Sequence, residues 1–176
     1  YYTDPHIWLD LALVSRQIDI IGDVLSQLDP AHQEYFKERA ATYQRELSEL
    51  DRAYRDGLAI CERREVVVSH QAFDYLGNRY RLAFFPIAGI SAEEEPSPAR
   101  LADLTKLIRQ KKITRVFFET LVSPKLAETI ARETGAKTDV LNPIEGLTTD
   151  EIQAGENYDT IMRSNLKRLR EAMVCQ

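Results

Sequence analysis

Residues 97–141 read SPARLADLTKLIRQKKITRVFFETLVSPKLAETIARETGAKTDVL, and this stretch indicates a parallel α/β fold. Two short apolar runs, at residues 114–119 and 137–141, each follow an amphipathic segment of helical periodicity. Both amphipathic segments begin with Ser-Pro, in which the serine can cap the helix and the proline suits the first helical position. Gly135 is expected to end the second of these helices. The alternation of helix and strand predicts parallel strands joined by helical crossovers.

Two more apolar runs lie nearer the N-terminus, at residues 65–69 (EVVVS) and 82–86 (LAFFP), and a helix is expected over residues 71–79 between them. Together with the two runs described above, they make four candidate strands. Because helical segments separate most of these runs, a four-stranded parallel sheet is the economical prediction. Residues 149–174 are expected to form one long amphipathic helix near the end of the chain.

The N-terminal third of the chain has helical periodicity and contains no candidate strand. A first helix is expected over residues 9–28 and a second over residues 30–60. Asp29 is expected to cap the second helix, with Pro30 at its first position. At about 1.5 Å per residue, the second helix would be a rod of roughly 45 Å. Such a rod exceeds the diameter of a small domain, so we expect it to bridge two lobes.

Composition and charge exclude several classes of protein. The chain has 176 residues, of which 44% are hydrophobic and 29% charged, and this excludes a disordered or collagen-like chain. The formal net charge of −5 and the lack of a basic stripe in the sequence argue against nucleic acid as a partner. The sequence contains no apolar run of about 18 residues that could span a bilayer. Residues 1–5 lack the basic and apolar regions of a signal peptide, so we expect either a cytosolic protein or one whose targeting segment has been removed.

Three histidines and one polar cluster are candidates for chemistry. His70 follows the first candidate strand, at the carboxyl end where open α/β sheets bind ligands. His6 lies in an irregular segment beside the single tryptophan, whereas His32 is expected to be solvated on a helix. Asn142 and Glu145 follow the last candidate strand. Two imidazoles and a carboxylate would suit Zn²⁺, but the spacing leaves open the alternative of packed, hydrogen-bonded histidines and a solvated carboxylate.

The two cysteines, Cys61 and Cys175, lie near the expected ends of the second helix and the last helix. They are either two buried thiols or a disulfide. A disulfide would close a long loop and contribute up to roughly 5 kcal/mol in the chain-entropy model. It would also indicate an oxidising compartment.

Five strings carry a resemblance to a known family, and together they cover the chain almost from end to end. They are DPHIWLD (residues 4–10), SHQAFDYLGNRY (69–80), IAGISAEEEPSPARLADL (87–104), FFETLVSPKLAETIARETGAKTDVLNPIEGLT (117–148) and ENYDTIMRSNLKRLREAM (156–173). They resemble the metal-binding solute-binding proteins of zinc and manganese ABC importers. The resemblance implies a periplasmic-binding-protein-like fold of two α/β lobes, with a long rigid connecting helix and the metal clamped between the lobes.

The resemblance also implies how the chain is divided. Residues 1–29 match the closing segment of the N-terminal lobe, and residues 30–60 match the long linking helix. Residues 61–148 match the C-terminal α/β lobe, with its four-stranded parallel sheet, and residues 149–176 match a long C-terminal helix. Because the match begins in the middle of such a protein, we expect the rest of the N-terminal lobe, the export signal and any lipid-attachment cysteine to be missing from this chain.

The ligands that the resemblance implies are His6, which matches the histidine of the DPHxWLD motif, and His70, which follows the first strand of the C-terminal lobe. Manganese-type relatives tend to have Glu in a SEGAF-like string at the second position, so the SHQAF of this chain resembles the zinc type. A nitrogen-rich ligand set is consistent with Zn²⁺ over Mn²⁺. Glu145 resembles the carboxylate ligand of the LNPxEGLT subgroup, with Asn142 behind it as a supporting residue or an alternative ligand.

Two further expectations concern the surroundings of the metal. The resemblance implies one more ligand, normally a histidine of the N-terminal lobe. Asp74 replaces the common Gly of the AFGYL string. It lies about one helical turn after His70, so it could orient the imidazole of His70 as a hydrogen-bond acceptor.

The resemblance implies a carrier and not an enzyme. We expect an extracytoplasmic protein, periplasmic or lipid-anchored on the cytoplasmic membrane, that captures Zn²⁺ and delivers it to the permease subunit of an ABC importer. We also expect it to be a monomer. The alternatives are a manganese-binding member of the family and a surface adhesin lipoprotein. A zinc hydrolase would need an open coordination position and a general base, and no HExxH motif is present.

Overall fold

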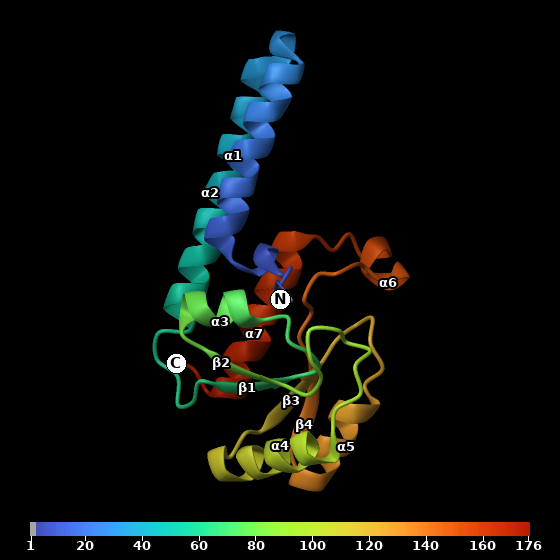
Figure 1. Cartoon of the computed structure of the whole chain (residues 1–176). Helices are drawn as coiled ribbons and strands as arrows, with labels where there is room; N and C mark the ends of the chain where they lie inside the picture. Colours follow the sequence, from blue (N-terminus) through green and yellow to red (C-terminus); the bar gives the residue numbers. More distant parts are fainter. Residues whose placement is uncertain (1–2) are drawn as a thin grey trace.

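Four parallel strands form the central sheet of this computed structural model, which describes residues 3–176 (Figure 1). The strands are β1 (Glu65–Val68), β2 (Ala83–Pro86), β3 (Arg115–Phe118) and β4 (Lys137–Val140). Their order in the sheet is β2-β1-β3-β4, and all three pairs are parallel. The predicted four-stranded parallel sheet is confirmed, and each strand lies within the apolar run that predicted it.

The strand order places a topological switch point between β1 and β3. The chain goes from β1 to β2 on one side and then returns across β1 to β3 on the other side. Val67 of β1 therefore pairs with Phe85 of β2 and with Val116 of β3. Ligands of open α/β sheets bind outside the carboxyl ends of the strands at such a point.

Helices cover both faces of the sheet. Successive side chains of each strand point to opposite faces, and apolar side chains on both faces pack against helices. Val66, Val68 and Phe117 belong to a core cluster with residues of α2, α3 and α7. Val67 and Val116 belong to a second cluster, with α4 and α5 on the other face. The bounds are α2 (Gln33–Gly57), α3 (Asp74–Tyr80), α4 (Pro98–Lys111), α5 (Lys125–Thr134) and α7 (Tyr158–Met173).

The helices α1 (Leu11–Leu28) and α2 lie side by side as a hairpin that projects away from the sheet (Figure 1). They approach closely at Gly22, where an added Cβ would lie 3.3 Å from the Cβ of Ala40. Near the sheet, α2 is buried through side chains such as Leu50. Several apolar side chains farther along α1 are exposed, namely Ile20, Ile21, Val24, Leu25 and Leu28.

The start of the second helix differs from the prediction. The expected helix over residues 30–60 is a short 3-10 helix, η2 (Pro30–His32), followed by α2. Asp29 does not cap it through its side chain, because its carboxylate accepts a hydrogen bond from His32 Nδ1 at 2.7 Å. At about 1.5 Å per residue, the 25 residues of α2 form a rod of roughly 38 Å.

The expected long helix over residues 149–174 is wrong, because the structure divides it into α6 (Thr149–Gln153) and α7. Gly155 lies between them in the left-handed conformation, with φ +73°. Asn157 then starts α7 by accepting a hydrogen bond from Thr160 N. An uninterrupted hydrophobic periodicity concealed these two stop and start signals.

Other helix caps agree with the sequence in part. The Ser97 side chain caps α4 by accepting from Arg100 N, and Gly135 ends α5 with φ +78°, both as expected. The expected cap at Ser123 is wrong, since α5 begins one residue later than this cap requires and Pro124 occupies the N-cap position. None of the helices within residues 3–176 is long and apolar enough to cross a membrane.

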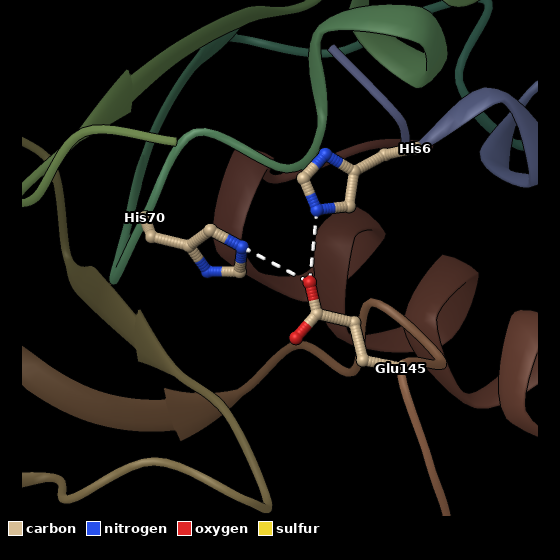
Figure 2. Close-up of side chains that lie close together, drawn as sticks. All are labelled: His6, His70 and Glu145. Atoms are coloured by element: carbon tan, nitrogen blue, oxygen red, sulfur yellow. Dashed lines mark hydrogen bonds and ion pairs between the residues drawn. The ribbon is translucent and has the colours of Figure 1, made fainter. Parts of the chain in front are cut away.

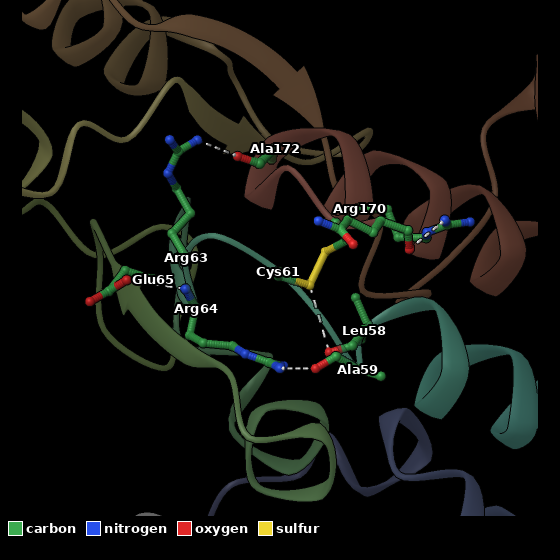
Figure 3. Close-up of a disulfide and its surroundings, with 10 residues drawn as sticks. Leu58, Ala59, Cys61, Arg63, Arg64, Glu65, Arg170 and Ala172 are labelled. Atoms are coloured by element: carbon green, nitrogen blue, oxygen red, sulfur yellow. Dashed lines mark hydrogen bonds between the residues drawn. A yellow bond between two sulfur atoms is a disulfide. The ribbon is translucent and has the colours of Figure 1, made fainter.

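Cys61 and Cys175 form a disulfide that joins the segment after α2 to the segment after α7 (Figure 3). The two cysteines also pair as an isolated antiparallel bridge. Arg63 Nη1 donates to Ala172 O at 3.3 Å, and Gln176 N donates to Ile60 O at 3.0 Å. Of the two alternatives that the sequence leaves open, the structure therefore contains the disulfide. It ties the end of the chain to the strand-forming part of the molecule.

Candidate metal centre

His70 lies at the carboxyl end of β1, and its side chain is only 1% exposed. Its Nδ1 atom is 2.6 Å from Oε1 of Glu119, the residue that follows β3. Because β1 and β3 are parallel neighbours, their carboxyl ends meet at one edge of the sheet. The strand order therefore brings a buried histidine and a buried carboxylate together across a sequence separation of 49 residues.

His6 reaches the same place from the N-terminal segment. It precedes the 3-10 helix η1 (Ile7–Leu9), and it is 2% exposed. Asp4 Oδ1 accepts hydrogen bonds from the backbone N of His6 at 3.0 Å and from its Nδ1 at 2.6 Å. The imidazole contacts the Trp8 ring edge to face, with the centroids 5.4 Å apart, and it contacts the His70 ring at 5.3 Å.

Glu145 completes the cluster from the loop after β4. Its Oε1 atom is 2.8 Å from His6 Nε2 and 3.2 Å from His70 Nε2 (Figure 2). One ligand atom from each of the three residues lies within 4.8 Å of the other two. A single cation between these atoms would be within reach of all three side chains.

The hydrogen bonds on the far side of each imidazole orient the cluster. In both histidines Nδ1 faces a carboxylate, Asp4 for His6 and Glu119 for His70. An Nδ1–H donated to a carboxylate leaves the lone pair on Nε2, the atom that points to Glu145. This carboxylate–histidine pattern is the one that usually holds a metal-binding imidazole in place. Two nitrogens and one carboxylate oxygen fit tetrahedral Zn²⁺, with a fourth position left for another ligand.

The charge of His70 depends on competing effects. Burial alone would lower the pKa of His70, but the hydrogen bond with Glu119 and the negative charges of Glu119 and Glu145 raise it. The net result is a pKa of His70 above its ordinary value. The cluster therefore attracts positive charge, either a proton on His70 or a metal cation.

Asn142, the alternative ligand, has both ends of its side-chain amide bonded to other protein groups. It is 5% exposed, and its Oδ1 atom accepts a hydrogen bond from Ile144 N at 2.8 Å. Ile144 has φ +61°, a left-handed conformation that is rare for a β-branched residue and costs of order 1–3 kcal/mol. The loop that carries Glu145 is thus strained immediately before this residue.

Asp74 does not orient His70, and this expectation from the sequence is corrected. Its carboxylate accepts a hydrogen bond from Gln71 Nε2 at 2.6 Å, while Glu119 occupies Nδ1 of His70. The helix α3 begins only at Asp74, so the residues between His70 and Asp74 do not form the helical turn that the prediction assumed. His32 is exposed beside Asp29, in the turn between α1 and α2, as expected.

Asp4 and Glu119 were missed from the sequence. Asp4 stands two residues before His6, where a short side chain can reach back to the same imidazole. Glu119 ends a candidate strand, so the rule that ligands gather at strand ends would have included it. Which strand lies beside β1 is set by the sheet order, and the sequence does not show that order.

Comparison with known proteins gives consistent matches along the whole chain. The family described as "ZnuA: Zinc-uptake complex component A periplasmic" matches residues 2–172. The zinc-binding lipoprotein AdcA of Streptococcus pneumoniae is 43% identical over 168 residues, which are 96% of this chain and 34% of that protein.

Solved structures match the fold as well. The Zn(II)-bound ZnuA-like domain of Streptococcus pneumoniae AdcA is similar with a TM-score of 0.83 and 42% identity, over 97% of this chain and 64% of that one. The laminin-binding protein Lmb of Streptococcus agalactiae, described as bifunctional with adhesin and metal-transporting activity, has a TM-score of 0.87 and 31% identity. The match covers 97% of this chain and 65% of that one. The chain thus spans about a third of the curated streptococcal relative and about two thirds of the solved domains.

Proposed function

This chain belongs to the family of periplasmic zinc-uptake components, and from this premise we propose that it is part of a solute-binding protein that captures Zn²⁺ for an ABC importer. The observation that carries the proposal is the meeting of two imidazole nitrogens and one carboxylate oxygen within 4.8 Å. His6, His70 and Glu145 are the proposed ligands. The zinc-binding relatives support the choice of Zn²⁺ as cargo.

Capture would depend on three segments that are far apart in the sequence. His6 comes from the N-terminal segment, His70 from the end of β1 and Glu145 from the loop after β4. The free energy of coordination is therefore also free energy that holds these segments together. Any ligand that the rest of the protein supplies would gain from the same coupling.

We also propose how the chain is divided among the parts of a two-lobe binding protein, on the basis of its family. We assign residues 1–29 to the closing segment of an N-terminal lobe, residues 30–60 to the linking helix, residues 61–148 to the C-terminal lobe and residues 149–176 to its last helical segment. Residues 1–2 lie outside the described residues. The projecting hairpin and the exposed apolar side chains of α1 support this assignment, because they suit a surface against which further protein packs.

The remaining parts of the proposal concern partners and place. The family is one of solute-binding transport proteins, and we propose that the protein acts without enzymatic activity, as a monomer that docks on the permease subunit of the importer. We propose a location in the cell envelope, outside the cytoplasm. The similarity to a zinc-binding lipoprotein supports this location. The disulfide supports this location, since such bonds persist in oxidising compartments.

Isothermal titration of the intact protein with Zn²⁺ and with Mn²⁺ tests the proposal. Removing a ligand by His6→Ala, His70→Ala or Glu145→Ala is expected to weaken Zn²⁺ binding by at least about 100-fold, more than the loss of an outer partner does. His32→Ala is the matched control, because His32 is exposed beside Asp29, and it should leave the affinity unchanged. Zinc binding that survives His70→Ala would contradict the proposal. Binding of Mn²⁺ in preference to Zn²⁺ would favour the manganese alternative.

A second candidate function is adhesion, because the similar protein of Streptococcus agalactiae is described as having adhesin activity. Binding of the intact protein to immobilised laminin, with and without Zn²⁺, tests this candidate. Binding that is lost when the metal is removed would indicate a surface that the metal shapes, and no binding in either state would reject adhesion.

A further inference from the structure

Asn142 is a buried amide with all its polar groups bonded. Its Oδ1 accepts from Ile144 N at 2.8 Å, and its Nδ2 donates to Glu151 Oε1 at 2.9 Å. Its backbone N and O bind the Oδ1 and Nδ2 of Asn165, at 3.0 and 2.7 Å. Asn165, which is itself 2% exposed, thus holds the backbone of Asn142, while Ile144 N and Glu151 hold its side-chain amide in one orientation.

Glu151 connects this amide to α6. Its Oε1 accepts from Asn142, while its Oε2 accepts from Thr148 N at 2.7 Å and from Thr148 Oγ1 at 2.9 Å. Thr148 Oγ1 in turn accepts from Glu151 N, which makes the capping box at the start of α6. Both carboxylate oxygens of Glu151 are therefore in use, one for the helix and one for Asn142.

The bond from Ile144 to Asn142 secures a conformation that the chain would otherwise avoid. Ile144 has φ +61°, and a strained backbone of this kind persists only where its surroundings hold it. Glu145 is the next residue, so the conformation of Ile144 sets the direction in which the Glu145 side chain leaves the loop. The observed outlier thus lies directly before a proposed metal ligand.

A second contact ties the same loop to the segment that carries His6. Trp8 Nε1 donates to Pro143 O at 2.7 Å, and Tyr158 at the start of α7 donates its hydroxyl to Trp8 O at 2.7 Å. The loop is therefore held from two directions, by Trp8 on one side and by Asn142 on the other. Only the contact from Asn142 leads on to α6.

We propose that Asn142 and Glu151 are positioning residues, which hold Ile144 in its left-handed conformation and so aim the Glu145 carboxylate at His6 and His70. This inference rests on the proposed function, because it takes Glu145 as a ligand of the metal. It extends that function by making zinc affinity depend on α6, a helix whose residues do not belong to the ligand cluster. A change in the contacts of Asn142 or Glu151 would then alter the zinc affinity while the ligands stay the same.

The first test compares Glu151→Gln with Asp150→Asn in Zn²⁺ titrations of the intact protein. Glutamine has one acceptor oxygen, so it cannot accept from Asn142 and Thr148 with two separate oxygens as Glu151 does. We expect Glu151→Gln to weaken Zn²⁺ binding about 10-fold, as the loss of an outer partner does. Asp150 is exposed, and no side-chain hydrogen bond of Asp150 occurs within residues 3–176, so Asp150→Asn controls for the same loss of charge on the same helix. Equal affinities of the two variants would overturn the inference.

A double variant separates positioning from general damage to the fold. If Glu151 acts through Glu145, adding Glu151→Gln to Glu145→Ala should cause no further loss of Zn²⁺ affinity. If instead Glu151→Gln weakens binding about 10-fold in both backgrounds, it acts by another route and the inference is overturned. Circular dichroism of each variant at the titration temperature establishes that the folded protein is the one measured.

The outcomes also distinguish this inference from the proposed function. Zinc binding that is unchanged by Glu145→Ala would overturn the ligand assignment and, with it, the positioning role. Zinc binding that needs Glu145 but is unchanged by Glu151→Gln would overturn the positioning role alone. Loss of affinity in Glu151→Gln only when Glu145 is present would support both.

Discussion

Glu119 accepts a hydrogen bond from His70 Nδ1 at 2.6 Å in a place where the carboxylate is 3% exposed. Its charge makes the opposite nitrogen, Nε2, a stronger donor to a cation. Glu119→Gln keeps the length of the side chain and an acceptor oxygen but removes the negative charge. We expect the variant to bind Zn²⁺ about 10-fold more weakly in a competition titration. Glu128→Gln on the exposed face of α5 is the control, and equal affinities in the two variants would contradict the role of Glu119.

The raised pKa of His70 gives zinc binding a definite pH dependence. Zn²⁺ binds the neutral imidazole, and the pKa of His70 lies above the ordinary value of about 6.5 because the effect of Glu119 and Glu145 exceeds that of burial. Protons therefore begin to compete with Zn²⁺ at a higher pH than an ordinary histidine would allow. Titrations between about pH 8 and pH 6 should show affinity that falls steadily as the pH is lowered. A constant affinity across this range would exclude His70 as a ligand.

At the residue scale, the sequence identifies side chains more readily than their neighbours. Motif resemblance predicted His6, His70 and Glu145, and the structure brings these three together. It did not predict Glu119, because the partner of His70 depends on β3 lying beside β1. The assignment of Asp74 failed because it assumed a helical turn directly after His70, where the chain is irregular.

At the element scale, one arginine ties α3 to the helical hairpin. Arg79 of α3 binds Asp51 of α2 through Nε and Nη2, both at 2.8 Å, and its Nη1 lies 3.2 Å from Asp10, the cap of α1. All three side chains are at most 20% exposed. Arg79→Ala would remove the guanidinium from both carboxylates, while Asp51 would keep its contacts with Tyr80 and Arg55.

We expect Arg79→Ala to lower the free energy of unfolding by about 2 kcal/mol, as the loss of hydrogen bonds between charged groups does. Urea denaturation of the metal-free protein measures it. Arg163→Ala provides the comparison, because Arg163 pairs with Asp159 on the exposed surface of α7, where such a pair contributes about 0.5 kcal/mol or less. Similar losses in both variants would show that Arg79 does not secure the hairpin.

The disulfide is the second tie between elements. It joins Cys61, before β1, to Cys175, after α7, across a sequence separation of 114 residues. We expect the double variant Cys61→Ser, Cys175→Ser to lose about 2–5 kcal/mol of unfolding free energy. Zinc affinity should change little. The disulfide lies near the amino end of β1, whereas the proposed ligands gather at the carboxyl ends of the strands. Thermal denaturation with and without a reductant measures the stability of the native protein, and an unchanged melting temperature would contradict this expectation.

Prediction of the elements succeeded where one local signal was sufficient. The strands β1, β2 and β3 were found because a short apolar run stands between polar residues, and Ser97 and Gly135 act as the sequence indicates. The single helix predicted over residues 149–174 failed because apolar periodicity continues through Gly155, whose left-handed backbone interrupts it. The capping box of Thr148 and Glu151 was not predicted, although the two residues fit the T-x-x-E pattern, and its link to Asn142 depends on the folded loop.

At the scale of the whole molecule, the parallel sheet places the candidate metal centre at its carboxyl edge, while the disulfide lies at the other end, where Cys61 precedes β1. The sequence predicted this sheet, and the resemblance implied that residues 30–60 are a linking helix. The sequence could not predict how far the hairpin of α1 and α2 projects, because that depends on which of their side chains pack against the rest of the molecule. The exposed apolar side chains of α1, such as Ile20 and Leu28, lie on this projecting part of the molecule.

Anomalous diffraction at the zinc absorption edge, from crystals of the zinc-loaded intact protein, would locate the bound metal. We expect one strong peak, within about 2.0–2.2 Å of Nε2 of His6, Nε2 of His70 and a carboxylate oxygen of Glu145. A peak at another place in the molecule, or a zinc ion that one of these three side chains does not reach, would contradict the ligand assignment.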